Sequence, residues 1–317
     1  MSDTDARFSL VAGEGDGAMI GLAAGDTAGG LWELGYSAIT QQATVVAYHL
    51  IEHGSLEAAP LERSIRELDG AADEEPVYRA ESPGFRSWLE GRAGIEAARP
   101  GPLDAAAGAI PLGVAFRKDP DQLWEAAMSM GEMFGEDPIS ILSRVVASAS
   151  VAASCFGQSG RDMVAGVIET VAATASSDTA RARSGGWPDV IPELEALLPM
   201  VGVSQAEEAV QMVAGPISPT PWDLVKVGVL LSAPPVTRSH IPVENAARVG
   251  GSHLGAMVGG IIGARVGIRA WPWAFANDTW FAEIGRRLVR GPHQVDDLPI
   301  PYAVEHHLNQ GERDGLY

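Results

Sequence analysis

The 317-residue sequence contains a single cysteine, Cys155. One cysteine excludes an internal disulfide and is typical of a protein that works in a reducing compartment. Cys155 lies in the small, apolar run VAASCFG, which favours a buried, inert thiol over a catalytic nucleophile.

Positive charge is also scarce, because 22 Lys and Arg face 41 Asp and Glu, a formal net charge of -19 at pH 7. Nucleic acids and anionic membranes attract positively charged surfaces, so we expect neither as a partner. The opening residues, MSDTDARFSLVAGEGDG, lack the basic region and apolar core of a signal peptide. The longest apolar stretch, residues 249–268, is interrupted by His253 and Arg265 and reads as a buried helix. We therefore expect a cytoplasmic protein.

Strand-like alternation is rare, and residues 7–12 are the best candidate of a poor set. Apolar residues at helical spacings instead predict helices along most of the chain. Residues 57–85 and 176–188 read as loops, the first with a short helix inside, and residues 304–317 are expected to fray. No stretch resembles an interdomain linker, so we expect a single all-α domain over residues 8–317. The predicted helices include residues 43–54, 121–135, 139–157, 162–175 and 280–291.

Two sets of glycines recur every four residues, one from Gly13 to Gly29 and the other from Gly251 to Gly267. On a helix such residues share a face, which offers a smooth surface to a neighbouring backbone. Each interior glycine costs ~1 kcal/mol of helix stability relative to alanine, so their repeated use predicts a contact that side chains would block. Two such helices packed together would bring their ends to a common pocket.

Polar residues surround a glycine-rich bend in GDTAGGLWELGYSAITQQAT, residues 25–44. Asp26 and Glu33 are seven residues apart, so a turn near Gly29 would bring both carboxyls to one side. Paired carboxylates can act as general acid and base, bind a cation or accept backbone amides. The residues alone favour a structural role for each.

Two further motifs have competing interpretations. GEGDGAMIG, residues 13–21, superficially matches a dinucleotide-binding loop, but the preceding strand and the strand–helix alternation are missing. In VGGSHLG, residues 249–255, Ser252 is a suitable N-cap whose helix start would favour an anion such as phosphate. The alternative is an ordinary capped helix with His253 packed or solvated.

Three separated segments resemble the ADP-ribosylglycohydrolase family, which is also known for dinitrogenase-reductase-activating glycohydrolase. GAMIGLAAGDTAGGLWE, residues 17–33, is similar to the family's Gly-Asp-Ala-x-Gly pattern and the glutamate that follows it. Residues 99–113 resemble its central segment ending in Pro-Leu-Gly, and residues 250–268 its closing Asp-Thr-Asp-Thr signature and glycine-rich helix. The resemblance implies an all-α single domain whose enzymes cleave the glycosidic bond at the anomeric carbon of ADP-ribose.

The sequence departs from this family at the residues that hold two magnesium ions, Thr-Asp-Asp-Thr and Asp-Thr-Asp-Thr. Magnesium prefers oxygen ligands that include carboxylates, and only Thr40 survives as a potential ligand. We therefore expect no metal and no cofactor. The corresponding residues here are Thr40, Gln41, Gln42 and Ala43 for the first motif and Gly250, Gly251, Ser252 and His253 for the second.

The resemblance and its departures together predict a metal-independent hydrolase acting on the N-glycosidic bond of an ADP-ribosyl or N-ribosyl compound. On this hypothesis Glu33 is the acid/base or nucleophile, Asp26 is its positioning partner, and His253 is a proton donor. The expected ligand-binding residues are Thr40, Gln41, Gln42, Asp104, Gly251 and Ser252.

Two alternatives from other functional classes stay open. The first is an inactive relative that binds ADP-ribose, NAD or an ADP-ribosylated protein, since lost ligands beside a retained scaffold fit that as well. The second is a structural protein that inherited the fold, as some crystallins related to this family did.

Overall fold

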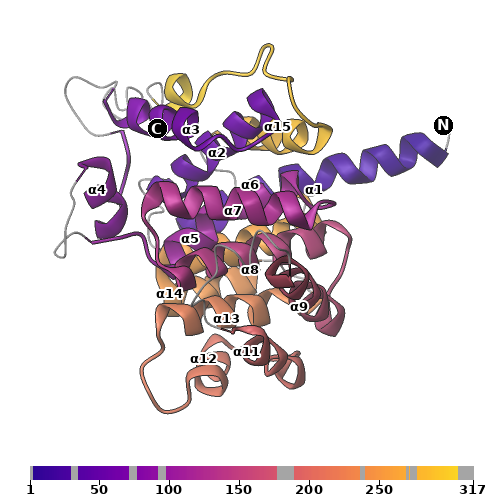
Figure 1. Cartoon of the computed structure of the whole chain (residues 1–317). Helices are drawn as coiled ribbons and strands as arrows, with labels where there is room; N and C mark the ends of the chain where they lie inside the picture. The colour runs from indigo at the N-terminus through magenta and orange to yellow at the C-terminus, as the bar shows by residue number, and fades with distance from the viewer. Residues whose placement is uncertain are drawn as a thin grey trace.

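Helix α14 (His240–Val266) and the C-terminal part of α1 (Asp3–Ala28) lie against each other at the centre of the fold, while the N-terminal turns of α1 project beyond it (Figure 1). The computed structural model describes residues 3–29, 35–70, 77–91, 98–176, 189–235, 240–268, 271 and 277–305, and it contains no strand among them. The prediction of an all-α fold is confirmed, while the domain boundaries 8–317 stay a prediction.

The other helices surround this central pair, and α15 joins it by packing along α1 (Figure 1). Their bounds are α2 (Ala38–His53), α3 (Ala58–Gly70), α4 (Pro83–Leu89), α5 (Pro102–Gly108), α6 (Ile110–Ala115), α7 (Pro120–Phe134), α8 (Pro138–Cys155), α9 (Gly160–Ser176), α11 (Ile191–Glu195), η1 (Leu198–Met200), α12 (Ala206–Ala214), α13 (Pro221–Ser232) and α15 (Asp278–Arg290).

The glycine ladders of α1 and α14 face each other in antiparallel order. A Cβ atom added to Gly21 would lie 2.1 Å from the carbonyl oxygen of Gly259, and one added to Gly25 would lie 2.0 Å from that of Gly255. No side chain fits at such distances, so the two backbones touch directly. The predicted glycine-lined helix contact is confirmed.

Gly251 breaks α14 at the point where this contact ends. Its φ of 67° and ψ of -166° lie outside the helical region, in a conformation that glycine adopts at little cost. The helix resumes after this break, where Ser252 lies against Gly29 at the end of α1. The break thus sets a new helix start beside the C-terminal end of α1.

Several helices begin at a polar cap followed by proline. Asp119, Asp137 and Thr220 each accept a hydrogen bond from the backbone N–H three residues further on. A proline follows each cap, at the first helical position, where its missing N–H costs nothing. The sequence therefore specifies the starts of α7, α8 and α13 locally.

Helix α8 is long and apolar enough to cross a membrane by length and composition, but 89% of it is buried inside the fold. It packs against α5, α6, α7, α9 and α14, so its apolar surface belongs to the core. Cys155 at its end is buried, as the sequence predicts.

Most helix predictions are confirmed, because α2, α7, α8, α9 and α15 cover the expected ranges within a few residues. The strand candidate at residues 7–12 is wrong, since these residues belong to α1. These residues continue the 26-residue helix α1 toward the N-terminus, so the six-residue alternation does not mark a separate strand. The short helix expected within residues 57–85 is confirmed as α3, whose buried Leu61, Ile65 and Leu68 follow helical spacing.

Candidate functional site

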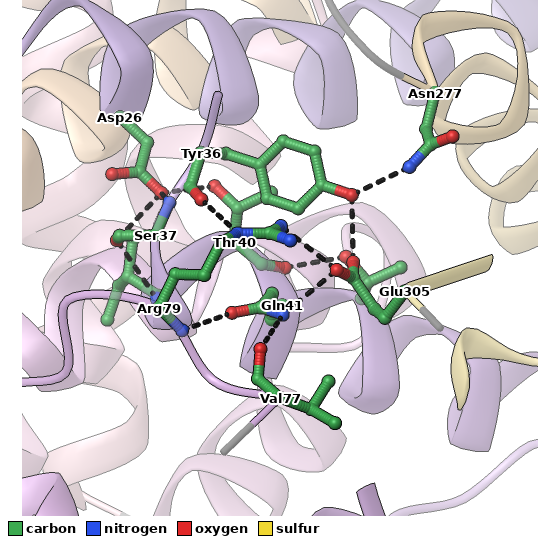
Figure 2. Close-up of polar contacts among 11 residues, drawn as sticks. Asp26, Tyr36, Ser37, Thr40, Gln41, Val77, Arg79, Asn277 and Glu305 are labelled. Atoms are coloured by element: carbon green, nitrogen blue, oxygen red, sulfur yellow. Dashed lines mark hydrogen bonds and ion pairs between the residues drawn. The ribbon is translucent and has the colours of Figure 1, made fainter. Parts of the chain in front are cut away.

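Asp26, near the end of α1, fixes the start of α2 (Figure 2). Its Oδ2 atom accepts hydrogen bonds from the backbone N–H of Ser37 at 2.8 Å, the Ser37 hydroxyl at 2.9 Å and the Thr40 hydroxyl at 2.7 Å. Its Oδ1 atom is fully buried and has no hydrogen-bond partner among the described residues. The Oδ2 atom of Asp26 therefore has a structural role, whereas the Oδ1 atom has no partner in the described chain.

The environment of Asp26 makes its carboxyl a weaker acid than a solvent-exposed aspartic acid. Burial raises the pKa of the Asp26 carboxyl, and the hydrogen bonds from Thr40 and Ser37 and the nearby charge of His253 offset this only in part. An acid with a raised pKa can donate a proton as well as accept one.

His253, just beyond the break in α14, pairs with Asp104 in the first turn of α5. The His253 Nε2 atom lies 3.1 Å from Asp104 Oδ1, and the two side chains are 23% and 17% exposed. The second carboxylate oxygen, Asp104 Oδ2, accepts the backbone N–H of Gly101 at 2.9 Å and so closes the start of α5. This pair is held in place by a capped helix yet reaches solvent.

The two members of this pair shift each other's pKa in opposite directions. Burial would lower the pKa of His253, but the hydrogen bond and charge of Asp104 and the charge of Asp26 raise it overall. Burial would raise the pKa of Asp104, but the hydrogen bond and charge of His253, with hydrogen bonds from Ser82 and Gly101, lower it overall. The raised pKa of His253 and the lowered pKa of Asp104 both favour the ion-paired form of these two side chains.

These side chains gather where α1, α2, α5 and the second half of α14 meet. Gly29 makes the approach close, because a Cβ atom on it would lie 2.4 Å from the backbone nitrogen of Ser252. The Asp26 carboxylate lies close enough to His253 for its charge to raise the histidine pKa. We call Asp26, Ser37, Thr40, Asp104 and His253 the Asp26 cluster.

A second polar group lies beside it, on the other side of the start of α2 (Figure 2). Glu305, only 1% exposed, accepts hydrogen bonds from the Tyr36 hydroxyl at 2.8 Å, Gln41 Nε2 at 2.9 Å and an Arg79 guanidinium nitrogen at 2.9 Å. Asn277 Nδ2 donates to the Tyr36 hydroxyl at 2.9 Å. We call Tyr36, Gln41, Arg79, Asn277 and Glu305 the Glu305 cluster.

Gln41 is fully used within the Glu305 cluster. Its Nε2 atom also donates to the carbonyl of Val77 at 2.9 Å, and its Oε1 atom accepts the backbone N–H of Arg79 at 2.9 Å. The Arg79 guanidinium lies 4.6 Å from the centre of the Tyr36 ring, a cation–π contact. Gln41 therefore fastens the chain around residues 77–79 to α2.

The sequence analysis missed Tyr36, Arg79 and Glu305 and expected the chain to fray from residue 304. Fraying is wrong at Glu305, which is buried and bonded. Tyr36 and Glu305 are 269 residues apart in the sequence, so no local pattern announces their contact. A buried carboxylate near a chain end needs a tertiary partner, which only the fold supplies.

The remaining predicted site residues have different fates. Glu33 lies outside the described residues. Gln42 is buried, and its Oε1 atom would lie 3.1 Å from a Cβ atom on Gly108, so it points at α5. Gly251 has the non-helical backbone conformation that breaks α14, and Ser252 is half-buried against Gly29. The structure thus brings Asp26, Thr40, Asp104 and His253 together, and it directs Gln41 elsewhere.

The described donor set does not fit a pair of magnesium ions. Two such ions need several carboxylate oxygens, and only Asp26 Oδ1 is unpartnered at this point. Both carboxylate oxygens of Asp104 already have partners, because Oδ1 faces His253 Nε2 and Oδ2 accepts the backbone N–H of Gly101. No group of three or more His, Cys, Asp or Glu suited to a metal occurs among the described residues.

Comparison with known proteins places this chain in a family. The model of the ADP-ribosylglycohydrolase family matches residues 14–297, nearly the full length of the chain. No curated protein matched the sequence. The matched range includes the glycine ladders, the Asp26 cluster and the all-α architecture. The chain belongs to the ADP-ribosylglycohydrolase family.

Proposed function

We propose that this protein is a metal-independent glycohydrolase that cleaves the N-glycosidic bond of an ADP-ribosyl or N-ribosyl compound in the Asp26 cluster. Family membership supports the reaction class and ADP-ribose-type substrates. The observation that carries the proposal is the combination of an unpartnered, buried Asp26 Oδ1 with a partly exposed His253–Asp104 ion pair.

In this proposal His253 is the general acid. Its Nε2 atom is held by Asp104, so the Nδ1–H group is the donor that faces the leaving nitrogen. As the bond between the anomeric carbon and nitrogen breaks, the nitrogen takes this proton and positive charge spreads over the ribose. Asp104 keeps the imidazole oriented and stabilises its charged form before the reaction.

Asp26 and Glu33 complete the proposed mechanism. Asp26 Oδ1 accepts a hydrogen bond from a ribose hydroxyl, while its Oδ2 atom keeps Ser37 and Thr40 in place. Glu33 takes a proton from the attacking water, whose oxygen bonds to the anomeric carbon. Glu33 lies outside the described residues, and its role rests on the resemblance of residues 17–33 to the family pattern.

One observation favours an alternative function, binding without turnover. Gln41 directs all its polar atoms into the protein, and Thr40 uses its hydroxyl on Asp26. Side chains already bonded within the protein cannot make new contacts that strengthen in a transition state. Catalysis depends on such contacts, whereas recognition of ADP-ribose or an ADP-ribosylated partner does not.

The first test measures thermal stability with ADP-ribose, NAD and adenosine monophosphate, each with magnesium and with a chelator. A ligand at a hundred times its Kd stabilises the native state by ~2.7 kcal/mol, which is readily detected. The proposal predicts a shift with ADP-ribose that the chelator does not remove. A shift that requires magnesium would contradict metal independence.

Product analysis then separates the two functions. We expect wild-type protein to release free ADP-ribose or ribose from an N-ribosyl substrate, and the Glu33→Gln and His253→Gln variants to release at least about a hundredfold less. Retained binding with no product from the wild type would establish the inactive alternative. Undiminished turnover by Glu33→Gln would remove that residue from the mechanism.

A further inference from the structure

A cavity of about 380 Å³ lies between α2, α3 and the segment 300–302, apart from the Asp26 cluster. Its lining residues on α2 and α3 recur at spacings of three and four, so each helix presents one face to it. His49 lies eight residues beyond Gln41 on α2, which is about 12 Å along a helix. The proposed glycohydrolase site does not use this cavity.

The charged residues that line the cavity are acidic. Glu52 comes from α2 and Glu67 from α3, and among the described residues no Lys or Arg belongs to the lining. Arg287, on the neighbouring α15, lies near enough to affect Tyr48, but it is paired with Glu283 at 2.7 Å. The cavity therefore carries negative charge with no lining cation to balance it.

The histidine at the base of the cavity adds no positive charge at neutral pH. Burial, together with the charge of neighbouring His53, lowers the pKa of His49 to about 4. His49 Nε2 accepts the backbone N–H of Glu57 at 3.2 Å, which also fixes the neutral tautomer. His49 is thus a neutral wall of the cavity.

Aromatic and aliphatic side chains supply the rest of the walls. Tyr48 of α2, Leu68 of α3 and Tyr302 of the segment 300–302 are all among the residues that line the cavity. Ile300 is 48% exposed, which is unusual for a large aliphatic side chain and leaves an apolar surface at the cavity. Aromatic faces beside carboxylates form a favourable environment for an organic cation.

We propose that this cavity binds a small organic cation, such as a quaternary ammonium or protonated amine with a compact apolar body. The charged head lies between Glu52, Glu67 and the two tyrosine rings, and the body packs on Leu68 and Ile300. A volume of about 380 Å³ is at the small end of ligand sites, which limits the ligand to a compact molecule.

Glu67 is the principal anchor for the cation. It is an exposed residue at the edge of the cavity and makes no hydrogen bond or ion pair with the other described residues, so its carboxylate can contact a ligand. Glu52 is partly engaged, because its Oε2 atom lies 3.3 Å from His53 Nε2. Glu67 therefore gains more than Glu52 from a bound cation.

The test compares choline with 3,3-dimethylbutan-1-ol, an uncharged molecule of the same shape, by calorimetric titration of the full chain. We expect choline to bind and the alcohol to bind at least about tenfold more weakly, because only choline interacts with the carboxylates and ring faces. Equal affinity for both molecules would overturn the proposal. So would the absence of choline binding up to about 10 mM, which is roughly the weakest binding that such a titration detects.

Matched variants separate a built site from the general attraction of an acidic protein for cations. Glu67→Gln should weaken choline binding about tenfold, whereas Glu62→Gln, which removes the same charge from α3 outside the cavity, should leave it unchanged. Equal losses in the two variants would mean non-specific attraction and would overturn the proposal.

The aromatic wall gives a second, independent readout. Tyr302→Phe keeps the ring and should retain choline affinity, while Tyr302→Leu removes the ring face and should weaken binding about fivefold. Equal affinity in the two variants would contradict a cation–π contact. The result is independent of the glycohydrolase proposal, because neither Glu67 nor Tyr302 belongs to the Asp26 cluster.

Discussion

The Asp26 cluster and the Glu305 cluster share the first turn of α2, yet they use it in opposite ways. In the Glu305 cluster, Gln41 has all its polar atoms bonded to the protein, and the Arg79–Glu305 ion pair is almost completely buried. In the Asp26 cluster, Asp26 Oδ1 lacks a partner in the described chain, and the His253 side chain is 23% exposed.

This difference shows that neighbouring residues of one motif can have different roles, one in holding the fold and the other in the candidate site. Thr40 and Gln41 are adjacent in the sequence, but Thr40 turns to Asp26 and Gln41 turns to Glu305 (Figure 2). A glutamine suits the second direction, because it donates to a carboxylate and accepts a backbone N–H at once. The bonded half holds the fold, and the open half is the candidate site.

The strongest test of the structural half is removal of its carboxylate. Glu305→Ala leaves Arg79 without its buried partner, so we expect the free energy of unfolding to fall by about 3–5 kcal/mol in urea titrations. The exposed Glu195→Ala should change it by less than about 0.5 kcal/mol. A similar small effect for both would mean that the Glu305 cluster does not stabilise the fold.

The corresponding change in the open half should act on chemistry. We expect His253→Gln to lower kcat for the N-ribosyl substrate about a hundredfold, because the proton donor is lost. The exposed His53→Gln serves as the matched control and should leave kcat unchanged. Steady-state kinetics on folded protein check this. A rise in KM with an unchanged kcat would assign His253 to substrate binding rather than to proton donation.

The close glycine contact between α1 and α14 should affect both the stability of the fold and ligand binding at the Asp26 cluster. Gly25→Ala places a Cβ atom 2.0 Å from the carbonyl oxygen of Gly255, beside Asp26, and we expect a loss of about 2 kcal/mol in stability. The displaced helices should also weaken ADP-ribose binding. Gly166→Ala is the control, because its Cβ atom meets mainly the flexible end of Gln158 and should be neutral or stabilising.

The smallest expected effect is the pH dependence of the His253–Asp104 pair. The raised pKa of His253 means that its contribution to stability is complete below the unfolded value near 6.5 and is lost as pH rises through the folded value. Each unit of raised pKa is worth about 1.4 kcal/mol. The stability difference between wild type and His253→Gln should therefore be largest near pH 6 and shrink above it. Urea titrations from about pH 6 to 9 check this, and a difference that grows with pH would reverse the assignment.

The sequence predicted helices and the ladder contact because their signals are local or costly. Helical spacing is visible within a dozen residues, and repeated glycines lower helix stability unless a neighbour needs the space. The strand candidate at residues 7–12 failed because a six-residue window carries little information about a helix of 26 residues. The short helix expected within residues 57–85 was found as α3, and only its length was not predicted.

The candidate site was predictable only in part. Asp26 and Thr40 lie in one short stretch, and their resemblance to a family motif marked them together. The pairing of His253 with Asp104 spans 149 residues, so the sequence named both residues without joining them. The partners of Gln41 were not foreseen at all, since a glutamine carries no sign of the direction in which its amide bonds.

The sequence by itself determined the all-α fold, the backbone contact between α1 and α14, and the family to which the chain belongs. The tertiary structure alone decided which polar groups are bonded and which are left available. The physical reason is range: helix periodicity acts between neighbours, whereas a buried carboxylate takes its partner from whatever the fold brings within hydrogen-bonding distance.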